Sequence, residues 1–199
     1  MKASHHVSQE PFFPESIINA KLTNFVHEGN FYIHGGFDAT LSLEVIPQLV
    51  QQINLKSGCK AGGKISIYVE SSGGFSSYAY NIIALMERAK AWGITVETYV
   101  FGDAFSCGSL VACAGSPGSR FIGPYAEHLC HLGRASTGYS SNDVIHQRNA
   151  DTVQEHFNRI RAIYMKYAKI KNLKKLIHDD GLTFRGQEII KNGLADKMI

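Results

Sequence analysis

Strand-like and helix-like segments alternate along most of this chain, and the alternation limits the folds that it can adopt. Residues 65–69, ISIYV, are β-branched and aromatic and predict a strand. The segment 77–92 carries apolar residues at helical spacing, and residues 95–101, TVETYVF, predict the next strand. Because strands that alternate with helices form parallel sheets through right-handed crossovers, the pattern predicts an α/β fold, with one domain over residues 1–199.

Further segments continue the alternation, and residues 1–20, which show no periodicity, are expected to be loosely ordered. We expect strands at 30–33, 120–122 and 128–132, and helices at 42–55, 106–114, 142–170, 173–178 and 185–192.

The segment 142–170 predicts a helix longer than a compact domain of this size needs. Its apolar residues recur close to a heptad spacing, at Val153, Phe157, Ile160, Tyr164 and Tyr167. We expect this handle-like helix to protrude and to bind another subunit, because a large apolar surface normally marks an interface. The alternative is a bent helix that wraps the sheet of its own chain.

Composition excludes several classes of function. The formal net charge is only +3, and no aromatic-basic pattern typical of an RNA or DNA reader accompanies the lysines of 166–175, so we expect no nucleic-acid partner. We expect no membrane span and no secretory signal, since neither apolar pattern is present. The 4 cysteines form no CxxC pair, so we expect no zinc site. Because no export signal is visible, we expect reduced thiols in a cytoplasmic protein.

A first candidate motif is ESSGGF at residues 70–75, between a predicted strand and a predicted helix. Gly73 and Gly74 would let the backbone turn sharply and present N–H groups to an oxyanion or a phosphate. The sequence matches neither the phosphate-binding GxxxxGK[ST] pattern nor GxGxxG. A purely structural turn is the alternative.

A second motif, GDAFSCGS at residues 102–109, again joins a strand to a helix. A serine at such a junction, here Ser106, can hold its hydroxyl above the sheet edge as a nucleophile. The alternative is that Ser106 only caps the helix.

The third motif, HLCH at residues 128–131, offers a base for that serine, since histidine has a suitable pKa. His128 and His131 are three positions apart, an odd spacing, so strand alternation turns one of them away. A third group should orient the base, and Asp179 and Asp180 are the candidates. Adjacent acids before a Gly-Leu-Thr turn also suit a turn or a helix cap.

Together these segments resemble the proteolytic subunit of the Clp protease family. IYVESSGGFSSYAYNIIALM is similar to the family's strand, glycine turn and helix, and GDAFSCGSLVACAGSPGSRF to its GxAxSxG nucleophile turn and return strand. GQEIIKNGLADKMI resembles its closing segment. The resemblance implies a βαβ spiral, shared with crotonase-type enzymes, with a long protruding helix through which subunits oligomerise.

The resemblance also implies roles for single residues. Ser106 would be the nucleophile, His131 the base and Asp179 or Asp180 the acid. The backbone N–H groups of Gly74 and Cys107 would form an oxyanion hole. Gly73 and Phe75 would bind the substrate.

The implied function is hydrolysis of peptides or unfolded proteins, a reaction that itself needs no ATP. It would take place inside a homo-oligomeric ring, single or stacked on a second ring. An ATP-driven unfoldase would deliver the substrate. No metal or other cofactor is expected. His131 is followed by Leu-Gly where the family has Gln-Pro, so a non-catalytic ring subunit is an alternative. A capsid-processing protease on the same fold and a crotonase-type acyl-CoA enzyme are the others.

Overall fold

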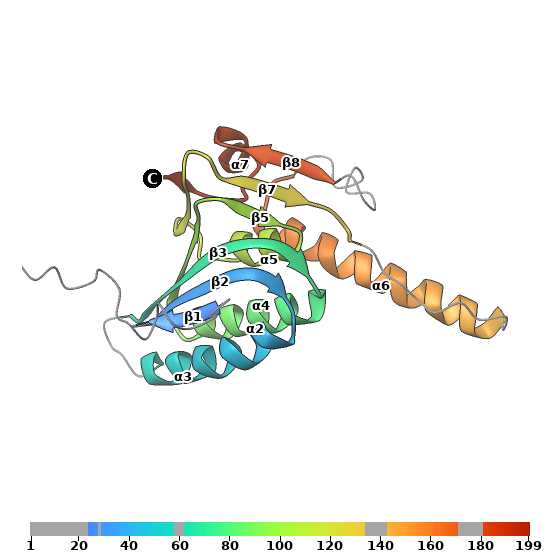
Figure 1. Ribbon diagram of the computed structural model, residues 1–199, viewed down its shortest axis with the longest axis horizontal. Coiled ribbons are helices and arrows are strands. Elements are labelled where there is room, and N and C mark those ends of the chain that lie inside the picture. The colour runs from blue at the N-terminus through green and yellow to red at the C-terminus, as the bar shows by residue number, and fades with distance from the viewer. Residues whose placement is uncertain (1–23, 28, 58–61, 134–142, 171–180) are drawn as a thin grey trace, which may run out of the picture.

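The computed structural model describes residues 24–27, 29–57, 62–133, 143–170 and 181–199 (Figure 1). The expected loose segment 1–20 and the expected helix at 173–178 lie outside these residues. The described strands are β1 Asn24–His27, β2 Asn30–Phe37, β3 Lys64–Gly74, β4 Thr95–Val100, β5 Asp103–Phe105, β6 Arg120–Ile122, β7 Glu127–Cys130, β8 Leu182–Arg185 and β9 Lys197–Met198. The helices are α2 Ala39–Glu44, α3 Ile46–Lys56, α4 Ser76–Ala91, α5 Cys107–Cys113, α6 Asp143–Tyr167 and α7 Gln187–Lys191.

The strands form one 9-stranded sheet that curls at β3, which confirms the α/β fold. The first half of β3 pairs in parallel with β4, while Ser71, near its end, pairs with Ala104 of β5. From β5 the sheet continues through parallel β7 to antiparallel β8. This change of partner along one strand brings the end of β3 beside the turn that follows β5.

Alternation along β3 separates the two faces of the sheet. Ile65, Ile67 and Val69 are buried on the face that α3 and α5 cover, while Tyr68 lies on the opposite face. There Tyr68 stacks between Tyr32 of β2 and Tyr99 of β4, with 4.7 Å between ring centroids on each side.

The helix expected at 42–55 is two helices, α2 and α3, with the break at Val45. Pro47 lies in the first turn of α3, where its missing N–H leaves no intrahelical bond unmade. The helix expected at 185–192 shrinks to α7, because β8 takes up the residues before it. Strands β1, β5, β8 and β9 were not predicted, since such short strands leave no clear period in the sequence.

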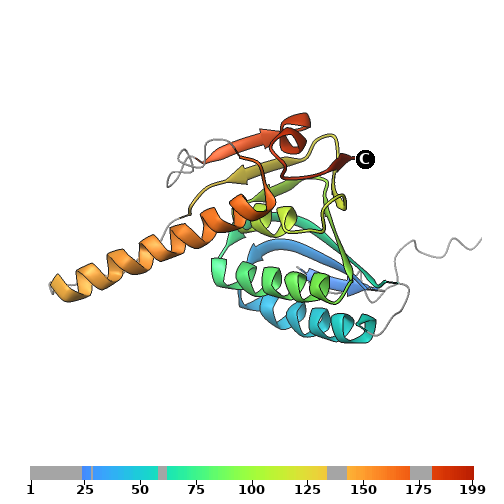
Figure 2. The same ribbon diagram turned by 180° about the vertical axis from the view of Figure 1, so that it is seen from behind.

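Helix α6 begins at Asp143 and ends at Tyr167, close to the expected bounds, and its first half extends away from the body of the molecule (Figures 1 and 2). The prediction that its apolar stripe would be left for another subunit was wrong for the second half. Phe157, Ile160 and Tyr164 are buried in the core of their own chain. Because the sheet curls, α5 lies between it and α6, and the apolar stripe of α6 packs toward α5.

Among the described residues, no helix has the length and apolarity required to cross a bilayer. The same residues contain no cluster of three or more potential metal ligands.

Candidate active site

Ser106 occupies a strained turn between β5 and α5. Its φ of 55° makes it the one residue other than glycine, in the described part of the chain, with a positive φ. It stands at the cap position of α5, yet its side chain makes no capping hydrogen bond. Its backbone N–H donates to Leu129 O of β7 at 2.8 Å, which fixes the turn against the neighbouring strand. The Ser106 hydroxyl therefore does not cap α5, and a strained backbone of this kind is typical of residues at functional sites.

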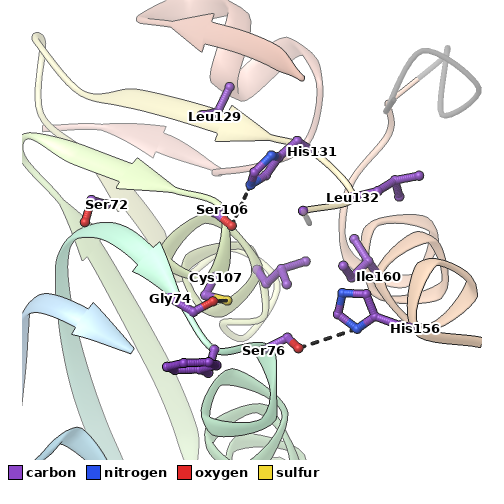
Figure 3. Close-up of a pocket in the computed structure, with 13 residues that line it drawn as sticks. Ser72, Gly74, Ser76, Ser106, Cys107, Leu129, His131, Leu132, His156 and Ile160 are labelled. Atoms are coloured by element: carbon purple, nitrogen blue, oxygen red, sulfur yellow. Dashed lines mark hydrogen bonds between the residues drawn. The ribbon is translucent and has the colours of Figure 1, made fainter. Parts of the chain in front are cut away.

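His131, just beyond the end of β7, lies against that hydroxyl. Its Nε2 is 2.7 Å from Ser106 Oγ (Figure 3). A hydrogen bond of this length allows the serine to donate its proton to the imidazole.

His128 lies on the opposite side of β7 in the core. It is fully buried, and its Nδ1 is 3.1 Å from Ser109 Oγ. Burial, assisted by the positive charge of Arg120, lowers the pKa of His128 to about 3, so its ring is neutral. Of the two histidines in the HLCH motif, His131 is the one next to Ser106.

The end of β3 approaches Ser106 so closely that only glycine fits. A Cβ on Gly73 would lie 2.6 Å from Ser106 Cβ, and one on Gly74 would lie 2.5 Å from the carbonyl oxygen of Phe37. The Gly73 N–H donates to Ser71 Oγ at 3.0 Å, and that hydroxyl donates in turn to Gly35 O. These bonds fix the conformation of the glycine turn.

Cys107, the first residue of α5, lies beside Gly74 of the glycine turn. Its thiol donates to Gly74 O at 3.2 Å. Burial raises the pKa of the Cys107 thiol to about 11, so it stays protonated and is a poor nucleophile.

A cavity of 430 Å³ opens beside Ser106 and His131 and is bordered by both Gly74 and Cys107. Its lining is mostly apolar. The residues around it are Ser72, Gly74, Phe75, Ser76, Ser106, Cys107, Leu110, Leu129, His131, Leu132, Gly133, His156 and Ile160.

Ser76 of α4 and His156 of α6 face one another on the side of the cavity away from His131 (Figure 3). His156 Nδ1 is 3.5 Å from Ser76 Oγ and 3.3 Å from the hydroxyl oxygen of Tyr80. Burial lowers the pKa of His156, with a smaller contribution in the same direction from Arg159, against a raising effect of a hydrogen bond with the Leu132 backbone.

Asp179 and Asp180 lie outside the described residues. The residue that follows them, Gly181, lies against the base: a Cβ there would be 2.9 Å from His131 Cβ and 2.7 Å from Cys130 O. The next residue, Leu182, pairs with Cys130.

Sequence reasoning missed the polar residues that support and line the site. Ser71 could have been found from strand alternation, which places it beside Gly73 on β3. Ser76 could have been suspected because it directly follows the glycine turn. His156 was hidden in the apolar stripe of α6, one residue before Phe157 and one turn before Ile160.

Comparison with known proteins gives concordant matches. A family model described as "Clp protease" matches residues 17–199. The "ATP-dependent Clp protease proteolytic subunit" of Streptococcus sanguinis is 31% identical over 142 residues, which cover 68% of each protein. The "ATP-dependent Clp protease proteolytic subunit 2" of Chlamydia trachomatis serovar D is 28% identical over 138 residues, covering 68% of this chain and 64% of the relative.

Proposed function

Because this chain belongs to the Clp protease family and is a serine endopeptidase, we propose that Ser106 is its nucleophile and His131 its general base. The observation that carries the proposal is the 2.7 Å contact between Ser106 Oγ and His131 Nε2 at the edge of a cavity. Asp179 or Asp180 completes the triad, and Gly181 beside His131 supports an acid from this stretch of chain.

In the proposed mechanism the Ser106 hydroxyl gives its proton to His131 Nε2 as it attacks the substrate carbonyl. The N–H groups of Gly74 and Cys107 stabilise the oxyanion of the tetrahedral intermediate. His131 then returns the proton to the leaving amine, and water hydrolyses the acyl-enzyme by the same steps. The hydrolysis itself uses no ATP and no metal.

The backbone at Gly73 and the ring of Phe75 are proposed to hold an extended peptide as an added strand. The exposed ring of Phe75, at 70% exposure, supports this role. An unfolded substrate fits such a site because its backbone groups are unpaired.

Membership of the family implies an oligomeric ring, and we propose that the protruding first half of α6 joins the subunits, within one ring or between stacked rings. Its extension away from the body supports this role (Figure 2). We also propose that chain 1–199 is one domain, and that the free thiols of Cys107, Cys113 and Cys130 reflect a reducing, cytoplasmic location.

The proposed partner is an ATP-driven unfoldase, which would bind the face of the sheet that carries Tyr68. A row of stacked aromatic rings crosses four strands there, from Tyr32 through Tyr68 and Tyr99 to Phe121, beside a cleft of 360 Å³. Half-exposed aromatic rings of this kind are typical of a protein–protein contact.

Other functions have less support. The Ser106–His131 contact disfavours a non-catalytic ring subunit. A crotonase-type reaction uses carboxylates, and no Asp or Glu is among the described residues that line the cavity. A capsid-processing protease would use the same proposed catalytic groups.

The test is labelling with a fluorophosphonate together with peptide hydrolysis. We expect Ser106→Ala to abolish labelling and to lower turnover by roughly a millionfold, while the oligomer stays intact. Ser77→Ala, an exposed serine outside the cavity, is the matched control and should label normally. Ser106→Ala protein that keeps more than a few per cent of turnover would contradict the assignment.

A further inference from the structure

The cavity beside Ser106 combines apolar walls with a polar end. Leu110, Leu132 and Ile160 supply aliphatic surface, and Ser76 and His156 supply polar atoms (Figure 3). Ser106, Gly74 and Cys107 all border this cavity, so a substrate side chain held in it lies next to the cleaved bond. The lining residues therefore bear on which substrates are cleaved.

The polar groups at that end keep hydrogen-bonding capacity after pairing among themselves. Two hydroxyls, of Tyr80 at 3.3 Å and Ser76 at 3.5 Å, approach His156 Nδ1. A ring nitrogen has a single lone pair or a single hydrogen, so one hydroxyl at a time can pair with it. Ser76 is the farther of the two and borders the cavity, whereas Tyr80 does not.

The Ser76 hydroxyl consequently has sites to offer a ligand. Even when its proton is donated to a neighbour, its oxygen keeps acceptor sites, and rotation of the hydroxyl can direct the proton into the cavity instead. A ligand group that both donates and accepts suits either orientation.

The described lining of the cavity offers no counter-ion to a charged ligand group. Among the described residues that line the cavity there is no Asp, Glu, Lys or Arg. Burial keeps the pKa of His156 low, so its ring is neutral at neutral pH. A carboxylate or ammonium group would lose its hydration without an opposite charge in return.

We propose that this cavity selects, through Ser76, a substrate residue with an apolar stem and an uncharged carboxamide tip, that is glutamine, on the amino side of the cleaved bond. The inference rests on the proposed function, since Ser106 defines which bond is cleaved. The aliphatic stem packs against Leu110, Leu132 and Ile160, and the amide pairs with the Ser76 hydroxyl.

The test uses fluorogenic peptides that differ only at this residue: glutamine, norleucine of matched length, and glutamate. We expect the wild-type protein to cleave the glutamine peptide with the highest kcat/KM. Ser76→Ala should lower the ratio of kcat/KM for glutamine over norleucine by about tenfold, the value of one neutral hydrogen bond. A ratio within one preparation cancels any general loss of active sites.

Two matched variants sharpen the result. Ser76→Thr keeps a hydroxyl and should retain the preference for glutamine. Ser77→Ala removes a serine from the same helix but outside the cavity, and its ratio should equal that of the wild type. A ratio that Ser76→Ala leaves unchanged, or a wild-type preference for norleucine or glutamate, would overturn the inference.

The two proposals fail in different ways. If Ser106 is not the nucleophile, Ser106→Ala will still cleave the peptides. If only the inference about Ser76 is wrong, Ser106→Ala will cleave none of them, and the glutamine ratio will not respond to Ser76→Ala.

Discussion

Two histidines of one short segment illustrate how burial decides the role of a residue. His131 borders the cavity and contacts Ser106, while His128 is enclosed in the core and pairs with Ser109. The sequence could show that they face opposite ways, because they are three positions apart along a strand. The choice of His131 rested on its spacing from Ser106 and on the family resemblance, since strand alternation does not tell which face is the core.

The low pKa of His128, about 3, makes the fold sensitive to acid. As pH falls through about 6.5, the unfolded chain binds a proton that the folded chain refuses until about pH 3. The free energy of unfolding is therefore greatest above pH 6.5 and falls by about 1.4 kcal/mol per pH unit within that window from this one group.

We expect His128→Gln to reduce the dependence of stability on pH between 6.5 and 4. This range lies between the ordinary pKa of histidine, 6.5, and the lowered pKa of His128, about 3. The glutamine amide can still pair with Ser109. The measurement is the urea midpoint at a series of pH values. His34→Gln, at an exposed histidine, is the control for loss of a surface imidazole. An equal pH dependence in wild type and His128→Gln would show that His128 is not the cause.

The acid of the triad is tested by Asp179→Asn and Asp180→Asn. Replacement of the correct one should keep the fold and lower turnover by roughly ten-thousandfold, because the imidazole loses the group that fixes its tautomer. The other replacement should cost little and serves as the control. Full activity in both variants would mean a serine–histidine dyad, or an acid from elsewhere.

The end of β3 carries glycine, and this allows its backbone to lie directly against Ser106, the proposed nucleophile. We expect Gly73→Ala to lower turnover by more than about 100-fold, since its Cβ would overlap Ser106 Cβ at 2.6 Å. Gly35→Ala is a close control: Gly35 also has a positive φ, +91°, but nothing lies within 4 Å of the added carbon.

Peptide hydrolysis and the urea midpoint of both variants separate the two effects. Gly35→Ala reports the cost of backbone strain alone, and Gly73→Ala reports strain plus the clash. If both variants lose activity equally, the close approach to Ser106 is not what makes Gly73 necessary.

Long elements with a clear period were predictable, and short ones were not. The strands β3 and β4 and the helices α4 and α6 follow from runs of apolar residues at a period of two or 3.6. Strand β5 has three residues, and its pairing depends on the curl of β3, which no local pattern encodes. The apolar stripe of α6 was visible, but its partner was not, because a stripe has the same sequence whether it binds its own core or another subunit.

At the scale of the whole molecule, the protruding half of α6 leads to a test of assembly. We expect the protein to form a ring oligomer at micromolar concentration, and the double variant Val144→Asp with Ile145→Asp, in that half of the helix, to shift it to smaller species. Multi-angle light scattering measures both. Met165→Asp, at an exposed site in the second half of α6, is the control and should leave the mass unchanged.

Ser106, His131, Gly74 and Cys107 all belong to one polypeptide, and this has a consequence for mixed assemblies. Each subunit brings its own nucleophile, base and oxyanion donors, so one inactive neighbour removes only its own share of the output. When wild-type subunits are reassembled with increasing proportions of Ser106→Ala subunits, hydrolysis of a short peptide should decline in a straight line with the mole fraction of the variant. The active sites of such a ring would work in parallel and independently, so the assembly would tolerate damage to single subunits.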